Sequence, residues 1–172
     1  SGLYSSEAND IAETEDGYIW IGSYAGLTRY DGKEFELIRE GGMVSITAMH
    51  TDSKGNLWVG TNAGKVAMYQ DGTFSFYELA DLDNMNSVRC FAEASDGSIY
   101  IGTTGEIFKI DANRQLHALD TGMKYVSSML FCEAGIVGCN YDGELFLMQE
   151  DMIREILRKD TGGTYYTCIS KT

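Results

Sequence analysis

Asp16-Gly-Tyr-Ile-Trp-Ile-Gly22 is a short apolar run between two glycines, and related runs return along the chain. The later copies are Lys54-Gly-Asn-Leu-Trp-Val-Gly60, Asp96-Gly-Ser-Ile-Tyr-Ile-Gly102 and a degraded Ala134-Gly-Ile-Val-Gly138. Their first glycines lie at 17, 55, 97 and 135, so the repeat advances by 38, 42 and 38 residues. A glycine-punctuated period of roughly 40 residues is typical of β-propeller blades or of another stacked β unit.

Each unit of the repeat divides into four predicted strands. A first strand leads into a tight turn, in which glycine supplies the positive φ that hairpins require. The second strand is apolar on both faces, as in a strand buried between two sheets. It carries a large ring at one shared position, occupied by Trp20, Trp58 and Tyr100, and we expect these rings to pack one blade against the next. A third strand follows, and a fourth, interleaved with charge, forms the outer edge.

The sequence therefore predicts an all-β fold of four four-stranded antiparallel β-propeller blades plus a trailing strand, as a partial or open propeller. We treat 1–172 as a single β-propeller segment, with blades at 7–38, 44–78, 87–120 and 125–158. The Asp- and Asn-rich stretch 80–87 is expected to be a loop, and 149–159 a strand despite its helical propensity. Tyr166-Thr-Cys-Ile169 matches Val88-Arg-Cys-Phe91, so 164–172 is expected to begin a further blade.

Charge and composition exclude several classes of protein. Thirteen basic and 26 acidic residues give a net charge of −13, and such a field repels nucleic acid and anionic membrane surfaces. No apolar run approaches the ~20 residues of a membrane helix and no signal peptide opens the chain, so any membrane attachment is expected from segments outside it. The four cysteines, with no metal-like spacing, are Cys90, Cys132, Cys139 and Cys168. Free thiols are the favoured interpretation, although Cys132 and Cys139 flank one hairpin and could meet.

The chain offers little of the chemistry that catalysis or metal binding needs. Its two histidines, His50 and His117, fall in different units, so a shared acid–base site is not expected. The Asp-Gly turns carry one or two carboxylates each, fewer than the oxygen donors of a calcium site, and turn formation explains them. The glycine-rich stretches lack the Lys-Ser/Thr ending of a phosphate-binding loop. We therefore expect no catalytic residues, no metal and no cofactor.

Polar and aromatic residues are predicted to gather at one face of the propeller, beside its channel, because they fall in loops or at strand starts. This channel-face rim consists of Tyr24, Asn62, Arg89, Tyr125, Asn140 and Tyr141. Such a mixture suits a sugar or a peptide. Ordinary loop or core roles remain the alternative for each of these residues, since most loop residues carry no function.

The stretch from Asp16 to Phe35, Asp-Gly-Tyr-Ile-Trp-Ile-Gly-Ser-Tyr-Ala-Gly-Leu-Thr-Arg-Tyr-Asp-Gly-Lys-Glu-Phe, resembles the two-component regulator propeller repeat. The resemblance is close in the first two units, weaker in the third and degraded in the fourth. It implies an extracytoplasmic input domain of a membrane-anchored bacterial signalling protein. In such proteins a histidine kinase, a hybrid two-component regulator or a diguanylate cyclase supplies the output.

The function expected from this resemblance is non-catalytic recognition of a small-molecule, glycan or peptide ligand. A protein-interaction scaffold is the main alternative, and a propeller lyase is a weaker one, because no histidine and glutamate set matches the lyase motif. Self-association is also expected, since a partial propeller leaves apolar sheet exposed at its open blade ends.

Overall fold

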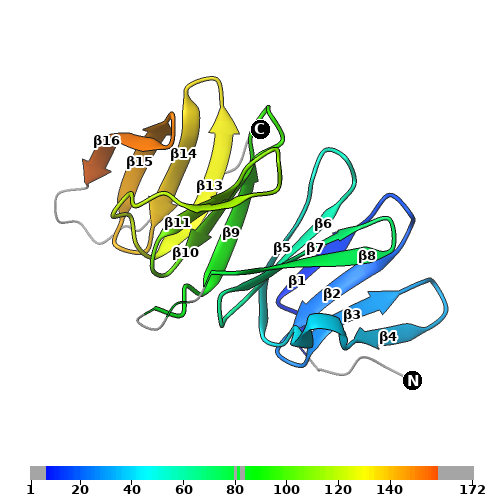
Figure 1. Ribbon diagram of the computed structural model, residues 1–172. Coiled ribbons are helices and arrows are strands. Elements are labelled where there is room, and N and C mark those ends of the chain that lie inside the picture. The colour runs from blue at the N-terminus through cyan, green and yellow to red at the C-terminus, as the bar shows by residue number, and fades with distance from the viewer. Residues whose placement is uncertain (1–6, 80, 82–83, 159–172) are drawn as a thin grey trace. The chain divides into compact units, whose positions relative to one another are not determined.

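The computed structural model describes residues 7–79, 81 and 84–158, and these residues form an all-β fold (Figure 1). Strands β1 to β16 make four separate four-stranded antiparallel sheets, each ordered as its strands follow in the sequence. The only helix among the described residues is a single 3-10 turn, η1 (Glu40–Gly42). The fold class predicted from the repeat is confirmed. The trailing strand predicted at 164–172 lies outside the described residues.

The sheets run from the inner strand to the outer strand in chain order. The first is β1 (Asp10–Glu13), β2 (Ile19–Ser23), β3 (Gly26–Tyr30) and β4 (Phe35–Ile38). The second is β5 (Ile46–Thr51), β6 (Leu57–Thr61), β7 (Lys65–Gln70) and β8 (Thr73–Glu78). The third is β9 (Val88–Glu93), β10 (Ile99–Thr103), β11 (Ile107–Ile110) and β12 (Leu116–Ala118). The fourth is β13 (Val126–Cys132), β14 (Gly135–Asn140), β15 (Glu144–Gln149) and β16 (Met152–Arg158).

The segment at 149–159, whose composition favours helix, supplies β16 and is extended over 152–158. Pairing with β15 explains this, because β16 forms a ladder with β15 from Gln149↔Met152 to Glu144↔Arg158, whereas a helix would leave that edge of β15 without a partner strand. The chain divides into two compact units, an N-terminal unit (1–88) and a C-terminal unit (89–172), and each is described by itself. The blade limits expected from the sequence stay predictions.

The core of the N-terminal unit lies between its two sheets. Trp20 of β2 is fully buried, and its ring centroid lies 4.7 Å from that of Tyr69 on β7. Leu27, Ile46 and Leu57 complete the same cluster. The prediction that the shared ring packs one blade against the next is thus confirmed for Trp20.

The second glycine of each of the first three repeated runs lies against the first residue of a later inner strand. A Cβ atom at Gly22 would lie 2.5 Å from Ile46 Cγ2, and one at Gly60 would lie 2.2 Å from Val88 Cγ1. In the C-terminal unit a Cβ at Gly102 would lie 2.8 Å from Val126 Cγ1. Ile46, Val88 and Val126, each the first residue of an inner strand, therefore fit into the slots that these glycines leave open.

The C-terminal unit has a corresponding core between its two sheets. Tyr100 and Ile107 of the third sheet pack with Ile136, Phe146 and Met148 of the fourth. The free thiols Cys90, Cys132 and Cys139 lie in this unit, and Cys168 lies outside the described residues.

One register prediction was wrong in the fourth sheet. The fourth copy of the repeated run ends at Gly138, which predicts that Gly138 takes the place of Gly60 at the end of the second strand, but β14 continues to Asn140. Ala48 pairs with Gly60 in the second sheet, whereas the matching Ser128 pairs with Cys139 in the fourth. The first hairpin of this sheet is shorter, which brings Gly135 into the strand and leaves Cys139 in the slot position.

Candidate functional site

The six predicted rim residues divide between the two units. Tyr24 follows β2 and Asn62 follows β6, both exposed in second-to-third-strand turns of the N-terminal unit. The C-terminal unit holds the other four: Arg89 on β9, Tyr125 just before β13, Asn140 at the end of β14, and Tyr141 in the turn after it.

A left-handed residue joins the two rim turns of the N-terminal unit. Ser45 has φ of 52° and precedes the inner strand β5. Its N–H donates to the Tyr24 carbonyl at 3.1 Å, and its own carbonyl accepts the Asn62 N–H at 2.9 Å. The Asn62 side-chain oxygen in turn accepts the Ser87 hydroxyl at 2.9 Å. The sheet-to-sheet spacing of this rim is therefore set by backbone hydrogen bonds.

The C-terminal unit repeats this arrangement with a tyrosine as the linking residue. Tyr125 has φ of 54°, a conformation that is costly for a bulky residue. Its N–H donates to the Thr104 carbonyl at 3.1 Å, and its carbonyl accepts the Tyr141 N–H at 3.0 Å. Both tyrosine side chains are 50% exposed. Two exposed aromatic side chains are thus carried by a backbone that the structure holds in place.

Asn140 stabilises the turn that contains Tyr141. It is only 2% exposed, and its Nδ2 donates to Glu144 Oε2 at 2.9 Å while its Oδ1 accepts the Glu144 N–H at 3.0 Å. A hydrogen bond from Arg158, which outweighs burial, lowers the pKa of Glu144. The ligand contact predicted for Asn140 stays a prediction, while its present contacts order the turn that carries Tyr141.

Arg89 occupies a repeated position at which two other units carry a brace, meaning a side chain that hydrogen-bonds to the next inner strand. The equivalent residues, eight before each turn glycine, are Asn9, Thr47 and Ser127. Asn9 Nδ2 donates to the Ile46 carbonyl at 2.8 Å, and Thr47 Oγ1 donates to the Val88 carbonyl at 2.6 Å. Each of these two side chains bonds the opening residue of the next inner strand. Arg89 places an exposed cation at this position instead.

Sequence reasoning missed the braces at Asn9 and Thr47. The signal that could have found them is the shared offset from the turn glycine, combined with a short hydrogen-bonding side chain at two successive positions. The same comparison singles out Arg89 as the residue that departs from the pattern.

A buried carboxylate, Asp52, stabilises the second sheet without being available to a ligand. Its Oδ2 accepts the Trp58 indole N–H at 2.9 Å and the Asn56 amide at 3.0 Å. Burial alone would raise the pKa of Asp52, but the hydrogen bonds from Trp58 and Asn56 outweigh it and lower the pKa. The group is ionised near neutral pH and serves the fold.

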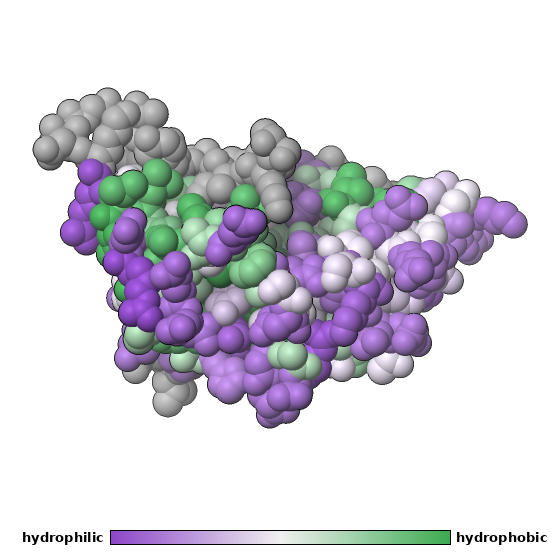
Figure 2. All heavy atoms as spheres, turned by 90° about the horizontal axis from the view of Figure 1, so that it is seen from above, coloured by the Kyte–Doolittle hydropathy of each residue, from purple (hydrophilic) through white to green (hydrophobic). Residues whose placement is uncertain are grey.

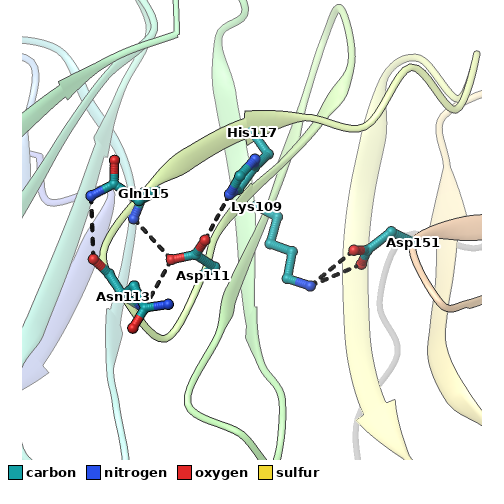
Figure 3. A network of polar contacts seen from close by, with 6 residues as sticks. All are labelled: Lys109, Asp111, Asn113, Gln115, His117 and Asp151. Atoms are coloured by element: carbon teal, nitrogen blue, oxygen red, sulfur yellow. Dashed lines mark hydrogen bonds and ion pairs between the residues drawn. The ribbon is translucent and has the colours of Figure 1, made fainter.

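A second polar network ties the third and fourth sheets together (Figure 3). Asp151, in the turn before β16, accepts the Tyr100 hydroxyl at 2.6 Å and the Lys109 ammonium at 2.9 Å. Burial, followed by the hydrogen bond to Asp151, raises the pKa of Tyr100 to about 12. Figure 3 also shows the neighbouring contact between His117 Nε2 and Asp111 Oδ2, 2.7 Å long, at the outer turn of the third sheet. His117 thus has a local partner on its own sheet.

The turn carboxylates are engaged by backbone N–H groups, as the turn interpretation requires. Asp31 Oδ1 accepts from the N–H groups of Lys33 and Glu34, both at 2.8 Å, and Asp111 Oδ1 accepts from Asn113 and Gln115. In the described ranges, no three His, Cys, Asp or Glu side chains come together in a way that could hold a metal ion.

A surface hollow of about 320 Å³ lies away from the rim, at the outer part of the first sheet, with Tyr18, Arg29, Glu36 and Arg39 in its lining. The Arg29 guanidinium lies 4.4 Å from the Tyr18 ring centroid and 2.6 Å from Glu36. The arginine is thus already held by an aromatic face and an ion pair, which favours the rim over this hollow as the candidate site.

Comparison with known proteins gives one family. The family model for the two component regulator propeller matches residues 5–25, 41–63 and 81–105. These segments cover the inner strand and the glycine-rich second strand of the first three sheets. No curated protein sequence matches the chain.

Solved structures of β-propellers share the fold at low sequence identity. The extracellular domain of BT3049 from B. thetaiotaomicron, named as a hybrid two component system, is 22% identical with a TM-score of 0.75, over 91% of this chain and 23% of that one. The extracellular domain of BT4673 from B. thetaiotaomicron, named as a one component system, is 21% identical with a TM-score of 0.64, over 86% of this chain and 21% of that one. A streptogramin B lyase is 17% identical with a TM-score of 0.75, over 94% of this chain and 57% of that one. The chain therefore spans between about a fifth and three-fifths of these relatives.

Among the residues that the structure describes, no helix is long and apolar enough to cross a membrane.

Proposed function

We propose that this chain, which carries repeats of the two-component regulator propeller family, is the ligand-recognising part of a bacterial signalling protein. The proposal places it outside the cytoplasm, as a portion of a membrane-anchored protein. It leaves the output to a histidine kinase, a hybrid two-component regulator or a diguanylate cyclase. Support comes from the family repeats together with the extracellular domains of a hybrid two component system and a one component system that share the fold.

The observation that carries a binding role is the pair of exposed tyrosines in the C-terminal unit. A left-handed conformation at a bulky residue costs of order 1–3 kcal/mol, and such strain clusters at functional sites. Tyr125 accepts this cost while presenting its ring to solvent next to the turn of Tyr141. Arg89 adds an exposed cation where the repeat elsewhere places a brace. A small-molecule, glycan or peptide ligand with polar groups and a flat or apolar face suits this combination.

A thermal-shift screen of the whole chain with glycans, peptides and small molecules tests the proposal. A ligand present at about 100 times its Kd should stabilise the chain by about 2.7 kcal/mol. We expect Arg89→Ala and Tyr141→Ala to abolish that stabilisation for a true rim ligand. Met152→Ala, at an exposed apolar position on β16, is the matched control and should retain it. A ligand whose effect survives both rim substitutions would contradict the proposed site.

A protein-interaction scaffold is the second candidate function. It would show binding of a protein partner over a broad apolar surface and no response to small ligands at the rim. Exposed apolar residues do occur on the outer strand of the fourth sheet, where Leu157 is 65% exposed. The same screen, read beside binding of candidate partner proteins, distinguishes the two.

A lyase activity is not part of the proposal, although propeller lyases share the fold. A histidine-to-alanine variant of virginiamycin B lyase from Staphylococcus aureus is catalytically inactive. In this chain His50 lies on β5 opposite Trp58, and His117 is bonded to Asp111. An acid–base site would need a histidine free to face a substrate in a cleft.

Self-association is proposed for the chain as it stands. Figure 2 shows apolar side chains gathered in part of a surface that is otherwise largely hydrophilic. The face of the fourth sheet that corresponds to the slot side of the other sheets carries Val137, Leu145, Leu147 and Leu157. Burying about 800 Å² on each partner would match a standard protein interface, and a second copy is the occupant proposed here.

A further inference from the structure

The four outer strands differ in how they are protected against pairing with another chain. β4 has four residues and carries Glu36, and β12 has only three residues. β16 carries Arg154, Glu155 and Arg158, and its register with β15 is interrupted by a bulge. Shortness, charge and bulges are the devices by which proteins blunt sheet edges.

β8 is longer than β4 and β12, has no bulge, and carries its only charge at its last residue. Its sequence Thr73-Phe-Ser-Phe-Tyr-Glu78 is uncharged until its last residue, and its register with β7 runs without interruption over all six residues. It is the last strand of its sheet, so one side of its backbone faces no other strand of that sheet. A regular, uncharged edge of this length is a template for strand addition.

The hydrogen-bond pattern shows which backbone groups of β8 are turned outward. The Leu79 N–H donates to the Gly64 carbonyl at 2.7 Å, on the side of β7. Because the direction alternates along an antiparallel strand, Ser75 and Tyr77 share that side, while Phe74, Phe76 and Glu78 point their N–H and carbonyl groups away. Three successive outward residues offer a ladder to an incoming strand.

Side chains hold this edge in one conformation. The rings of Phe74 and Phe76 stack with centroids 6.0 Å apart, and Phe74 lies 5.1 Å from Tyr69 in the core. On the other face Tyr77 stacks on Trp58 at 6.3 Å. Phe76 is 37% exposed, so it leaves apolar surface beside the edge for a partner side chain. The strand is pre-ordered, which reduces the entropic cost of adding another.

Charge decides what kind of strand fits. Asp71 in the preceding turn and Glu78 at the far end flank the uncharged core of β8, and the whole chain carries −13. Glu78 pairs with Lys65 at 3.2 Å, but its side chain stays 63% exposed. A second copy would bring the same acidic flanks and the same net charge, and one added strand buries little area to offset that repulsion. A strand with basic flanks is attracted both by the acidic residues that flank β8 and by the net negative charge of the chain.

We propose that β8 binds an extended segment of a partner protein by strand addition, and that this segment has an uncharged alternating core flanked by Lys or Arg. This site lies apart from the tyrosine rim and is independent of the ligand proposed there. The backbone of Phe74, Phe76 and Glu78 provides the ladder, and the exposed part of Phe76 contacts an apolar side chain of the partner.

Amide hydrogen exchange of the full chain, followed by NMR, tests this directly with the synthetic peptide Lys-Thr-Val-Thr-Val-Thr-Lys as the probe. In the free chain Ser75 and Tyr77 should be protected, while Phe74, Phe76 and Glu78 exchange quickly. With about 1 mM peptide, we expect the latter three amides to slow by about tenfold or more. A peptide of the same sequence with every backbone amide N-methylated has the same charges but no backbone N–H donors, and it should have no effect.

Two protein variants sharpen the test. Phe76→Pro removes an outward donor and leaves the bonds to β7 intact, so it should abolish peptide binding. Phe76→Leu keeps that donor and an apolar side chain, and it should bind within about threefold of the parent chain. If the proline variant fails to fold, the exchange pattern of the parent chain still decides the matter.

Three outcomes would overturn the proposal. The first is the absence of any slowing at Phe74, Phe76 and Glu78 with the probe. The second is equal binding of a peptide in which Glu replaces both Lys residues, which would remove the charge argument. The third is protection of the same amides that rises with chain concentration in the absence of peptide, which would make a second copy the occupant.

Discussion

At the scale of single residues, one repeated position shows how the chain satisfies its buried rings. Trp20 donates its indole N–H to Thr14 at 2.8 Å, and Trp58 donates to Asp52 at 2.9 Å. Thr14 and Asp52 both lie three residues before the turn glycine, where the third unit has Ala94. With no acceptor at that place, the third ring is a tyrosine that reaches Asp151 on the next sheet.

Replacing Asp52 by alanine should destabilise the chain by about 2 kcal/mol or more, because the buried Trp58 N–H loses its acceptor. Asp52→Asn is the matched variant, since it keeps an acceptor oxygen and should cost less. Urea unfolding monitored by tryptophan fluorescence gives both values. Equal stability of the alanine variant and the parent chain would show that water replaces the carboxylate.

The same carboxylate gives stability a defined pH dependence. The pKa of Asp52 is lowered in the folded chain, so its contribution is complete above the unfolded value of about 3.9 and is lost as pH falls through the folded value. The parent chain should therefore lose stability in acid more steeply than Asp52→Asn does. Parallel slopes of unfolding free energy against pH would contradict this assignment.

A substitution at Tyr125 should affect the stability of the chain and its affinity for a rim ligand in different ways. Tyr125→Gly relieves the left-handed strain at φ of 54° and should leave the chain as stable as the parent or up to about 1 kcal/mol more so. It also removes one ring of the proposed site, so affinity for a rim ligand should fall. Thermal unfolding and ligand titration measure the two effects. Tyr125→Asn, which tolerates the same backbone, controls for the added freedom of glycine.

At the scale of strands and turns, the slot glycines determine how closely sheets approach. Gly60→Ala would place its Cβ 2.2 Å from Val88 Cγ1, and we expect a loss of about 1–3 kcal/mol from overpacking. The double variant Gly60→Ala/Val88→Ala should recover part of that loss, which a double-mutant cycle by chemical denaturation measures. Additive losses would mean that the two residues do not share one slot.

Strand order and the core rings could be predicted from the sequence because each is repeated at a fixed spacing. The register of the fourth sheet could not, because its shortened hairpin removes the turn that anchors the alignment and moves Cys139 to the slot. The rim was predictable only as a set of positions in loops or near strand ends. The sequence gives no sign that Asn140 is turned inward by Glu144, because loop polarity does not specify direction.

At the scale of the whole molecule, net charge and exposed apolar surface oppose each other. A charge of −13 repels like copies, whereas the apolar face on the fourth sheet favours their contact. Repulsion between charges farther apart than about 8–10 Å is screened at physiological salt, but burial of apolar area is not weakened by it. The balance between association and solubility should therefore shift with ionic strength.

Light scattering across salt concentration checks the proposed self-association. We expect the apparent mass to rise from the 19.0 kDa monomer as salt increases. Leu157→Lys, which adds charge to an exposed apolar position on β16, should hold the chain closer to the monomer mass. A mass of one chain at every salt concentration, or association unaffected by the lysine, would count against contact through this face.

The left-handed residues that link neighbouring rim turns have an evolutionary consequence. Ser45 and Tyr125 make the connection through main-chain groups alone, so it does not depend on the side chains of Tyr24 and Tyr141. Mutations at Tyr24 or Tyr141 can therefore accumulate with little penalty to folding, whereas the side chain of Asn62 also accepts a hydrogen bond from Ser87. Evolution could therefore change what such a module recognises by substituting these two tyrosine side chains one at a time, while the backbone that carries them stays the same.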